Sequence, residues 1–206
     1  MRRDRPDLLR QSGGSDKQEP LLNTALLLID VQESFRQRPY FREDPAMSFL
    51  ARANALVEGC FQRGVPVVRV LHVDDPVAPD DPFAMESGYV RPMTGLVEFN
   101  PAASFIKTRH SALVGTGLSV WLRQRGIGRL IVAGIRTEQC CETTTRHASD
   151  EGLEVDYVAE ATLTFDMKHA DGSPLPAADI VKRTCAVLKD RFATICSVEE
   201  ALQRAR

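Results

Sequence analysis

The chain has 206 residues, of which 43% are hydrophobic, and a formal net charge of −2 at pH 7. This near-neutral charge gives no indication of a nucleic-acid or anionic membrane surface, and no apolar stretch approaches the roughly 18–20 residues that cross a bilayer. The charged N-terminus lacks the apolar core of a secretory signal, so we expect a soluble protein of the cytoplasm.

Apolar runs and helical periodicity alternate along the chain after a polar arm at residues 1–22, and they predict one domain over residues 23–206. In chain order, the expected strands are residues 24–30, 67–72, 104–107, 128–134, 154–159 and 192–195, and the expected helices are residues 45–63, 116–125, 138–151, 176–190 and 197–205. Such alternation is typical of a parallel sheet with helices on both faces. Right-handed crossovers then give a three-layer α/β/α sandwich of the Rossmann-like type.

Three reactive side chains follow strands of this sheet. Asp30 ends the first strand, Lys107 ends the third, and Cys140 follows the fourth. Because ligands bind beyond the carboxyl ends of parallel strands, we expect a carboxylate, an ammonium and a thiol to share one pocket. The long loop at residues 73–103 is rich in Pro, Asp and Gly, and long loops in compact domains are usually functional.

The surroundings of Cys140 are typical of a nucleophile. Thr137 could cap the helix that carries the thiol, and both the helix dipole and Lys107 should lower the thiol pKa. Asp30 would act as general base, and the thiolate would attack an amide or ureide carbonyl to give a thioester that water hydrolyses. Backbone N–H groups of residues 136–140 would bind the oxyanion.

Each of these residues also has a purely structural interpretation, as a turn aspartate, a solvated lysine or a buried cysteine. The chain has five cysteines, and no spacing among them predicts a zinc site or a disulfide framework. Cys60, Cys185 and Cys196 lie in apolar or helical contexts that favour simple burial. We therefore expect reduced thiols throughout.

Three sequence blocks resemble the isochorismatase-like cysteine hydrolases: residues 28–35 (LIDVQESF), 106–113 (IKTRHSAL) and 134–141 (GIRTEQCC). The resemblance spans roughly residues 24–205 and makes residues 23–206 a hydrolase domain of this kind. It implies a catalytic triad of Asp30, Lys107 and Cys140, and a six-stranded sheet in the order 3-2-1-4-5-6. It also implies a cis peptide between Ile135 and Arg136, in an oxyanion-hole turn that includes Thr137 and Cys140.

The family pattern Thr-x-x-Cys selects Cys140 over its neighbour Cys141 as the nucleophile. The resemblance also implies a homodimer or homotetramer, and we expect no nucleic-acid or membrane partner. Apolar positions around residues 115–122, including Trp121, are candidates for the core or for a subunit contact.

Nicotinamidases of this family hold a metal with an Asp-x-His and a later His after the second strand. Here that region reads HVDDPVAPDDP from His72 onwards, which does not match the pattern, so we predict no metal and no other cofactor. The expected substrate contacts are Phe35, His72, Tyr89 and Arg136, with His110 as a further candidate at the pocket edge. His169 is expected at the surface.

The sequence therefore predicts a cysteine-dependent hydrolase that cleaves a C–N bond of a small amide, carbamoyl or ureido compound. Two alternatives remain open. One is a vinyl-ether hydrolase of the isochorismatase type, which can work without the thiol. The other is a non-catalytic redox or interaction protein.

Overall fold

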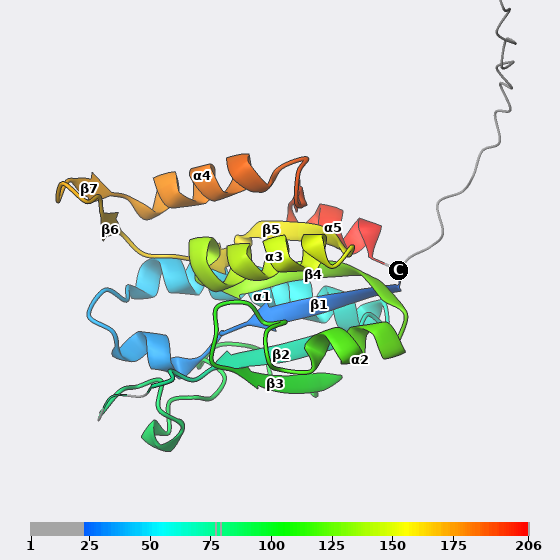
Figure 1. Cartoon of the computed structure of the whole chain (residues 1–206), viewed down its shortest axis with the longest axis horizontal. Coiled ribbons are helices and arrows are strands. Elements are labelled where there is room, and N and C mark those ends of the chain that lie inside the picture. The colour runs from blue at the N-terminus through cyan, green and yellow to red at the C-terminus, as the bar shows by residue number, and fades with distance from the viewer. Residues whose placement is uncertain (1–22, 77, 79, 206) are drawn as a thin grey trace, which may run out of the picture.

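The computed structural model describes residues 23–76, 78 and 80–205, so the predicted N-terminal arm lies outside the described residues. A six-stranded parallel sheet forms its centre, in the order β3-β2-β1-β4-β5-β8 (Figure 1). The strands are β1 (Asn23–Ile29), β2 (Val67–His72), β3 (Ala103–Lys107), β4 (Ile127–Ile135), β5 (Glu154–Leu163) and β8 (Thr194–Cys196). The predicted fold class and strand order are confirmed, with β8 as the sixth strand of the sheet.

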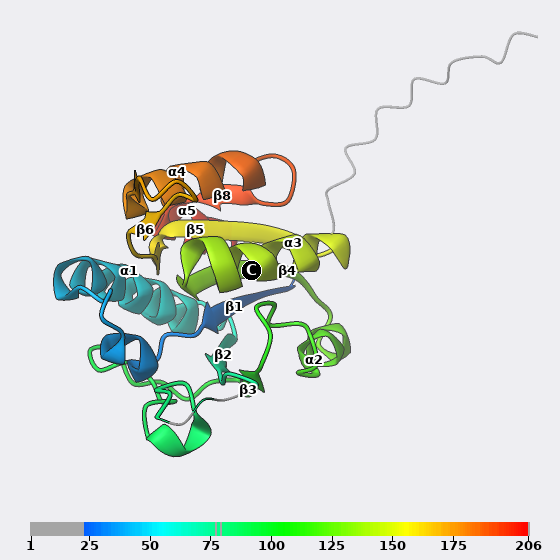
Figure 2. The same ribbon diagram turned by 60° about the vertical axis from the view of Figure 1, so that its left-hand side comes forward.

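In the described part of the chain, five α-helices cover the sheet. They are α1 (Glu43–Gln62), α2 (Leu118–Gln124), α3 (Glu142–Asp150), α4 (Ala177–Leu188) and α5 (Val198–Arg204), with short 3-10 turns η1 (Glu33–Gln37) and η2 (Met85–Ser87) in the loops. Figure 2 shows α1 on one side of the sheet and α2 and α3 on the other. Each lies within a few residues of its predicted range.

Strand β1 shows why the core has two halves. Its residues alternate between the faces: Leu26 and Leu28 belong to the cluster under α1 and α5, whereas Leu27 and Ile29 belong to the cluster under α2 and α3. All four side chains are at most 1% exposed. A strand buried on both faces needs a continuous apolar run, which is what the sequence provides.

The segment after the fifth strand differs from the prediction. Strand β5 continues to Leu163 instead of ending at residue 159, and a small antiparallel hairpin, β6 (Met167–Lys168) and β7 (Pro174–Leu175), occupies part of the predicted loop. Glu160 interrupts the apolar run of β5, so the sequence pattern does not reveal that the strand continues to Leu163. The hairpin strands have two residues each, too few to give a pattern, and exposed His169 lies in the connection between them.

Helix α5 begins with a capping box, as its predicted start at Ser197 suggests. The Ser197 hydroxyl accepts a hydrogen bond from the Glu200 N–H at 3.1 Å, and the Glu200 carboxylate accepts one from the Ser197 N–H at 2.8 Å. Replacing Ser197 by alanine is expected to lower the free energy of unfolding by about 1 kcal/mol in urea denaturation. The matched control is Ser48→Ala on the exposed side of α1, which should stay within about 0.5 kcal/mol of the parent. Equal effects of the two substitutions would contradict the cap.

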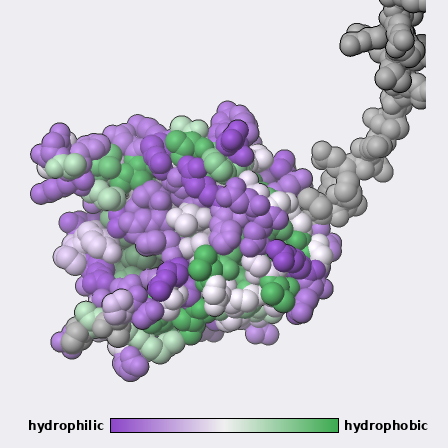
Figure 3. Space-filling view, viewed as in Figure 1, coloured by the Kyte–Doolittle hydropathy of each residue, from purple (hydrophilic) through white to green (hydrophobic). Residues whose placement is uncertain are grey.

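Among the described helices, none combines the length and hydropathy of a membrane span. On the face drawn in Figure 3, apolar side chains gather over α2 and the loop before it. Val114 and Val120 in this segment are 43% and 55% exposed, while Trp121 packs partly into the core with Arg125 stacked 4.3 Å above its ring. This is the region for which we predicted subunit contacts, and the oligomeric state stays a prediction.

Candidate active site

The structure brings the three predicted catalytic side chains together at the carboxyl edge of the sheet. The Nζ atom of Lys107 lies 2.8 Å from Oδ2 of Asp30 and 3.3 Å from Sγ of Cys140. Strand β1 lies between β2 and β4, and β3 borders β2, so the ends of these strands are close in space. Asp30, Lys107 and Cys140 are only 0%, 1% and 6% exposed. A buried ion pair therefore lies against a buried thiol.

Asp30 directly follows β1 and has a left-handed backbone conformation, with φ of 53°. Its N–H donates to the Val70 carbonyl at 2.8 Å, and its own carbonyl accepts from the Gln32 N–H at 2.9 Å, so the backbone is fixed on both sides. Apart from the ion pair with Lys107, neither carboxylate oxygen has a hydrogen bond of good geometry to any described residue. The carboxylate can therefore still accept a proton.

Lys107 donates in three directions. Besides Asp30 and Cys140, its ammonium faces Nδ1 of His72 at 3.2 Å. Burial favours the neutral amine, but the Asp30 carboxylate and the Cys140 sulfur outweigh it and raise the pKa of Lys107 above its ordinary value. Lys107 is thus a fixed positive charge next to the sulfur.

Cys140 lies in a single π-helical turn (Thr137–Cys141) that precedes α3. The predicted capping role of Thr137 is wrong, because its side chain turns inward and donates to the Thr162 hydroxyl of β5 at 2.8 Å. The carbonyl of Thr137 accepts a hydrogen bond from the Tyr157 hydroxyl at 2.9 Å. Two bonds to β5 therefore anchor the turn that carries the sulfur.

The predicted low pKa of the thiol is also wrong. Burial raises the pKa of Cys140 far above its ordinary value, and the charge of Asp30 raises it further, while Lys107 opposes both effects only in part. Neither the burial nor the approach of Asp30 can be read from the local sequence around the cysteine. Burial and the Asp30 carboxylate therefore favour the neutral thiol over the thiolate in the free protein.

This assignment predicts how the free thiol responds to pH. Only the thiolate reacts with iodoacetamide, so the rate of Cys140 alkylation should rise without a plateau from about pH 7 to about pH 10. Peptide mass spectrometry after timed quenching would measure the rate at this cysteine alone. A plateau below about pH 8 would mean that the thiolate already exists in the free protein, contrary to this expectation.

A small pocket of about 150 Å³ opens onto Cys140. Its aromatic wall is formed by Phe35, Tyr40 and Phe83, and its polar lining includes Arg38, Gln139 and the imidazoles of His72 and His110. Nδ1 of His110 lies 3.9 Å from the sulfur. Of these, Phe35, His72 and His110 were expected as residues. Phe83 lies in the loop at residues 73–103 that we expected to be functional, and Gln139 lies in the expected oxyanion turn at residues 136–140. Arg38 and Tyr40 were missed, and only their closeness to Phe35 along the chain could have indicated them.

Tyr89 does not reach this pocket, contrary to its expected role as a substrate contact. Its side chain is 37% exposed, and its carbonyl accepts hydrogen bonds from the backbone N–H and the hydroxyl of Ser34. The residue thus closes a loop and is not part of the pocket lining.

Arg136 does line the pocket, and the peptide bond between Ile135 and Arg136 is cis. Its Nη2 lies 3.1 Å from Oε1 of Glu138, and its guanidinium carbon lies 5.4 Å from the ring centre of Tyr40 and 5.5 Å from that of Phe165. The Thr164 hydroxyl donates to the other oxygen of Glu138. The guanidinium is therefore held rigidly, with its charge balanced by Glu138.

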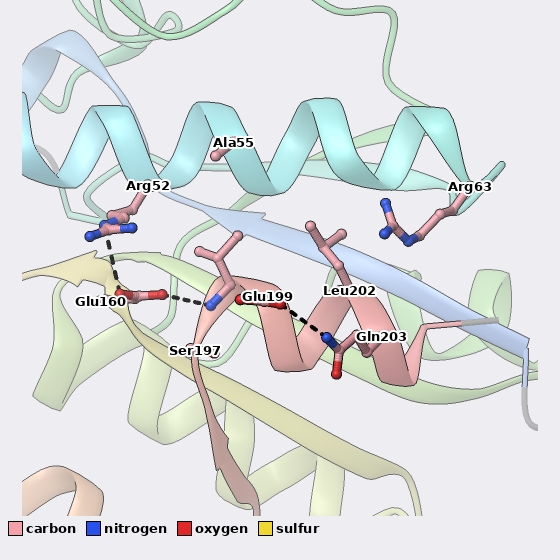
Figure 4. A pocket seen from close by; sticks show the side chains of 9 residues that line it. Arg52, Ala55, Arg63, Glu160, Ser197, Glu199, Leu202 and Gln203 are labelled. Atoms are coloured by element: carbon pink, nitrogen blue, oxygen red, sulfur yellow. Dashed lines mark hydrogen bonds and ion pairs between the residues drawn. The ribbon is translucent and has the colours of Figure 1, made fainter.

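A second, more open pocket of about 460 Å³ lies between α1 and α5 (Figure 4). Its polar groups pair with one another: Arg52 faces Glu160 at 3.6 Å, and Glu160 accepts from the Val198 N–H at 2.6 Å. Its lining contains neither cysteine nor histidine. Cys140 and its two histidine neighbours therefore line the smaller pocket and not this one.

The metal site of nicotinamidases does not fit the residues that follow β2. Both ring nitrogens of His72 are engaged, Nδ1 by Lys107 and Nε2 by Asp74 at 2.8 Å. Within the described part of the chain, no three His, Cys, Asp or Glu side chains are grouped as metal ligands.

Comparisons with known proteins agree with the fold. The Isochorismatase domain matches residues 24–200. The uncharacterized isochorismatase family protein YrdC of Bacillus subtilis is 25% identical over 183 residues, which cover 86% of this chain and 94% of the relative. Nicotinamidase 3 of Arabidopsis thaliana is 28% identical over 156 residues, covering 69% of this chain and 74% of the relative.

Among solved structures, an isochorismatase from Pseudomonas putida superimposes with a TM-score of 0.73 at 26% identity, covering 86% of this chain and 89% of that one. The domain match extends over most of the sequence, and the sheet order and the full-length relatives agree with it. The chain therefore belongs to the isochorismatase family of hydrolases.

Proposed function

We propose that the protein is a cysteine-dependent amidohydrolase that cleaves the C–N bond of a small amide, carbamoyl or ureido compound. One observation carries the proposal: the buried Lys107 ammonium touches both the Asp30 carboxylate and the Cys140 sulfur beneath a small pocket. A nucleophile and a base held together in this way are the elements of acyl transfer through a covalent intermediate.

The reaction begins with the neutral thiol, since its pKa is raised. As Sγ of Cys140 forms a bond to the substrate carbonyl carbon, Asp30 takes the thiol proton. The same proton then passes to the substrate nitrogen, the C–N bond breaks, and the amine or ammonia departs. Water attacks the remaining thioester while Asp30 takes a proton from it, and this proton returns to the departing sulfur. Asp30 thus acts alternately as base and acid.

Lys107 supplies charge where the reaction needs it. Its ammonium lies 3.3 Å from the sulfur, so it stabilises the negative charge that develops as the thiol proton leaves. The oxyanion would be bound by backbone N–H groups of residues 136–140, in the turn anchored by Tyr157. Loss of one oxyanion donor typically costs about 2.7–4 kcal/mol of transition-state stabilisation, so this turn matters as much as the side chains.

The volume of the pocket, about 150 Å³, suits a small substrate. An aromatic wall beside Arg38, Arg136 and Gln139 suits a compact compound with both a flat or apolar part and polar groups. The likeness to Nicotinamidase 3, whose name describes cleavage of a small amide, supports the C–N bond as the target.

A panel of small amides, carbamoyl compounds and ureides, assayed for released ammonia or amine, tests the proposal. Acid quenching during turnover should reveal an acyl mass on the peptide that contains Cys140, and hydrolysis in ¹⁸O-labelled water should place the label in the acid product. Turnover without any adduct, retained when Cys140 is replaced by alanine, would refute the thioester route. Cleavage of isochorismate with that same retention would identify the vinyl-ether hydrolase instead.

A further inference from the structure

The contact between Lys107 and His72 determines which ring nitrogen of His72 carries the proton. An ammonium group has three N–H donors and no acceptor, so the ring nitrogen that faces it must be unprotonated. Lys107 uses two donors on Asp30 and Cys140, and the third faces Nδ1 of His72 at 3.2 Å. The ring proton must then lie on Nε2, which is 2.8 Å from Oδ1 of Asp74, an acceptor. These contacts select one tautomer of the neutral imidazole.

The backbone of His72 is clamped in place by a buried glutamine. The side chain of Gln32, which is 0% exposed, accepts a hydrogen bond from the His72 N–H at 2.7 Å and donates to the His72 carbonyl at 3.0 Å. The imidazole also meets the edge of the Phe83 ring, with ring centres 5.9 Å apart. The end of β2 is therefore fixed relative to the loop that follows β1.

Asp74 is held from its other side. Its Oδ2 lies 3.7 Å from Nη2 of Arg38, and the same guanidinium nitrogen donates to Asp81 at 2.9 Å. Asp74 cannot turn away from His72 without weakening this arrangement. The chain of contacts from Asp81 through Arg38, Asp74 and His72 thus ends on the ammonium of Lys107.

We propose that His72, oriented by Asp74, is a positioning residue that holds the Lys107 ammonium between Asp30 and Cys140. A neutral acceptor suits this place because a second carboxylate would compete with Asp30 and with the developing thiolate for the ammonium. The imidazole instead takes the third N–H without adding negative charge. The effect on turnover rests on the proposed function, whereas the tautomer and the orientation of Lys107 do not.

Burial and the ammonium of Lys107 favour the neutral imidazole. It faces Lys107 from β3, Asp30 from the end of β1, and Asp74, behind which lies Arg38. Burial lowers the pKa of His72 and the ammonium of Lys107 lowers it further, while Asp30 and Asp74 oppose them. Protonation would place a second positive charge beside Nζ and would remove the acceptor, so the arrangement should be lost in acid.

Nitrogen-15 NMR of the histidine rings in the full chain tests the tautomer without any substrate. We expect His72 to be neutral with its proton on Nε2 at neutral pH, and Asp74→Ala should leave the proton there, because the Lys107 ammonium still faces Nδ1. Exposed His169, in the connection between β6 and β7, serves as the reference histidine outside this site. A proton on Nδ1, or an imidazolium at neutral pH, would overturn the proposal.

Two substitutions test the positioning itself. Asparagine at position 72 places an oxygen close to the location of Nδ1, whereas leucine has no acceptor. His72→Leu should lower kcat by about 10- to 100-fold with little change in KM, since small misplacements of catalytic groups cost this much. His72→Asn should recover most of that loss and should remove the histidine ionisation from the pH profile of Cys140 alkylation.

Equal losses in the two variants at equal thermal stability would refute a role for the acceptor, and an effect on KM alone would make His72 a substrate contact instead. If no compound in the panel is hydrolysed, the proposed function fails but this inference does not. The ratio of Cys140 alkylation rates in the asparagine and leucine variants then decides it: a ratio close to one overturns it, and a several-fold ratio supports it.

Discussion

Replacing Cys140 by alanine is expected to lower kcat/KM by at least about 10⁴-fold, since the variant has no atom to form the thioester. Asp30 and Lys107 would still bind each other, so the pocket and the fold should persist. Steady-state kinetics on the best substrate of the panel would measure the loss. Circular dichroism and thermal melting would show that the variant is folded.

The adjacent cysteine provides a matched control. Cys141 is 0% exposed and packs in the core beneath α2 and α3, away from the pocket lining. Cys141→Ala should therefore reduce stability, on the order of 1–2 kcal/mol, and keep turnover within a few-fold of the parent. The reverse result, with activity lost at position 141 and kept at position 140, would show that the family pattern selects the wrong sulfur.

The layers of the fold could be predicted because the strands are buried on both sides. Every residue from Ala25 to Ile29 is apolar, and such a run admits no amphipathic alternative. The strand order followed from the family resemblance, not from the run itself. The β6–β7 hairpin was not predicted because its strands are short and largely exposed. An alternation of apolar and polar residues arises only where one face of a strand is buried.

The meeting of Asp30, Lys107 and Cys140 could also be predicted, because parallel strands end at one edge and each residue follows such an end. The direction in which the pKa of the Cys140 thiol is shifted could not be predicted from the sequence. The sequence shows a positive neighbour and a nearby helix, but burial and the approach of Asp30 decide the pKa, and both depend on packing between distant segments.

Gln32 shows a further limit of sequence analysis. In the stretch LIDVQESF it reads as an ordinary polar residue after a strand, yet its side chain bonds to both backbone groups of His72. Backbone partners carry no signature of their own in the sequence. Contacts of this kind therefore become visible only in the structure, although they hold the site as firmly as contacts between side chains.

Gly134 is the position where the smallest substitution should do the most damage to the fold. It lies in β4 directly beside Ile29 of β1, with φ of 136°, and a Cβ there would come within 1.9 Å of the Ile29 carbonyl oxygen. That oxygen belongs to the backbone immediately before Asp30 and cannot move without shifting the strand. Gly134→Ala should therefore cost at least about 4 kcal/mol, a large part of the roughly 5–15 kcal/mol that stabilises a typical domain.

Gly64→Ala is the control that separates two costs of Gly134→Ala: the clash of the new Cβ with the Ile29 carbonyl, and the strain of a positive φ. Gly64 also has a positive φ, of 68°, but a Cβ there would meet nothing within 4 Å. Its replacement should cost only about 1 kcal/mol, the strain of a left-handed alanine. Urea denaturation of both variants measures the difference, and Gly134→Ala should in addition lower any turnover found with the substrate panel, because Asp30 directly follows β1. If the two substitutions cost the same, the contact between β4 and the Ile29 carbonyl does not hold the active-site edge of the sheet together.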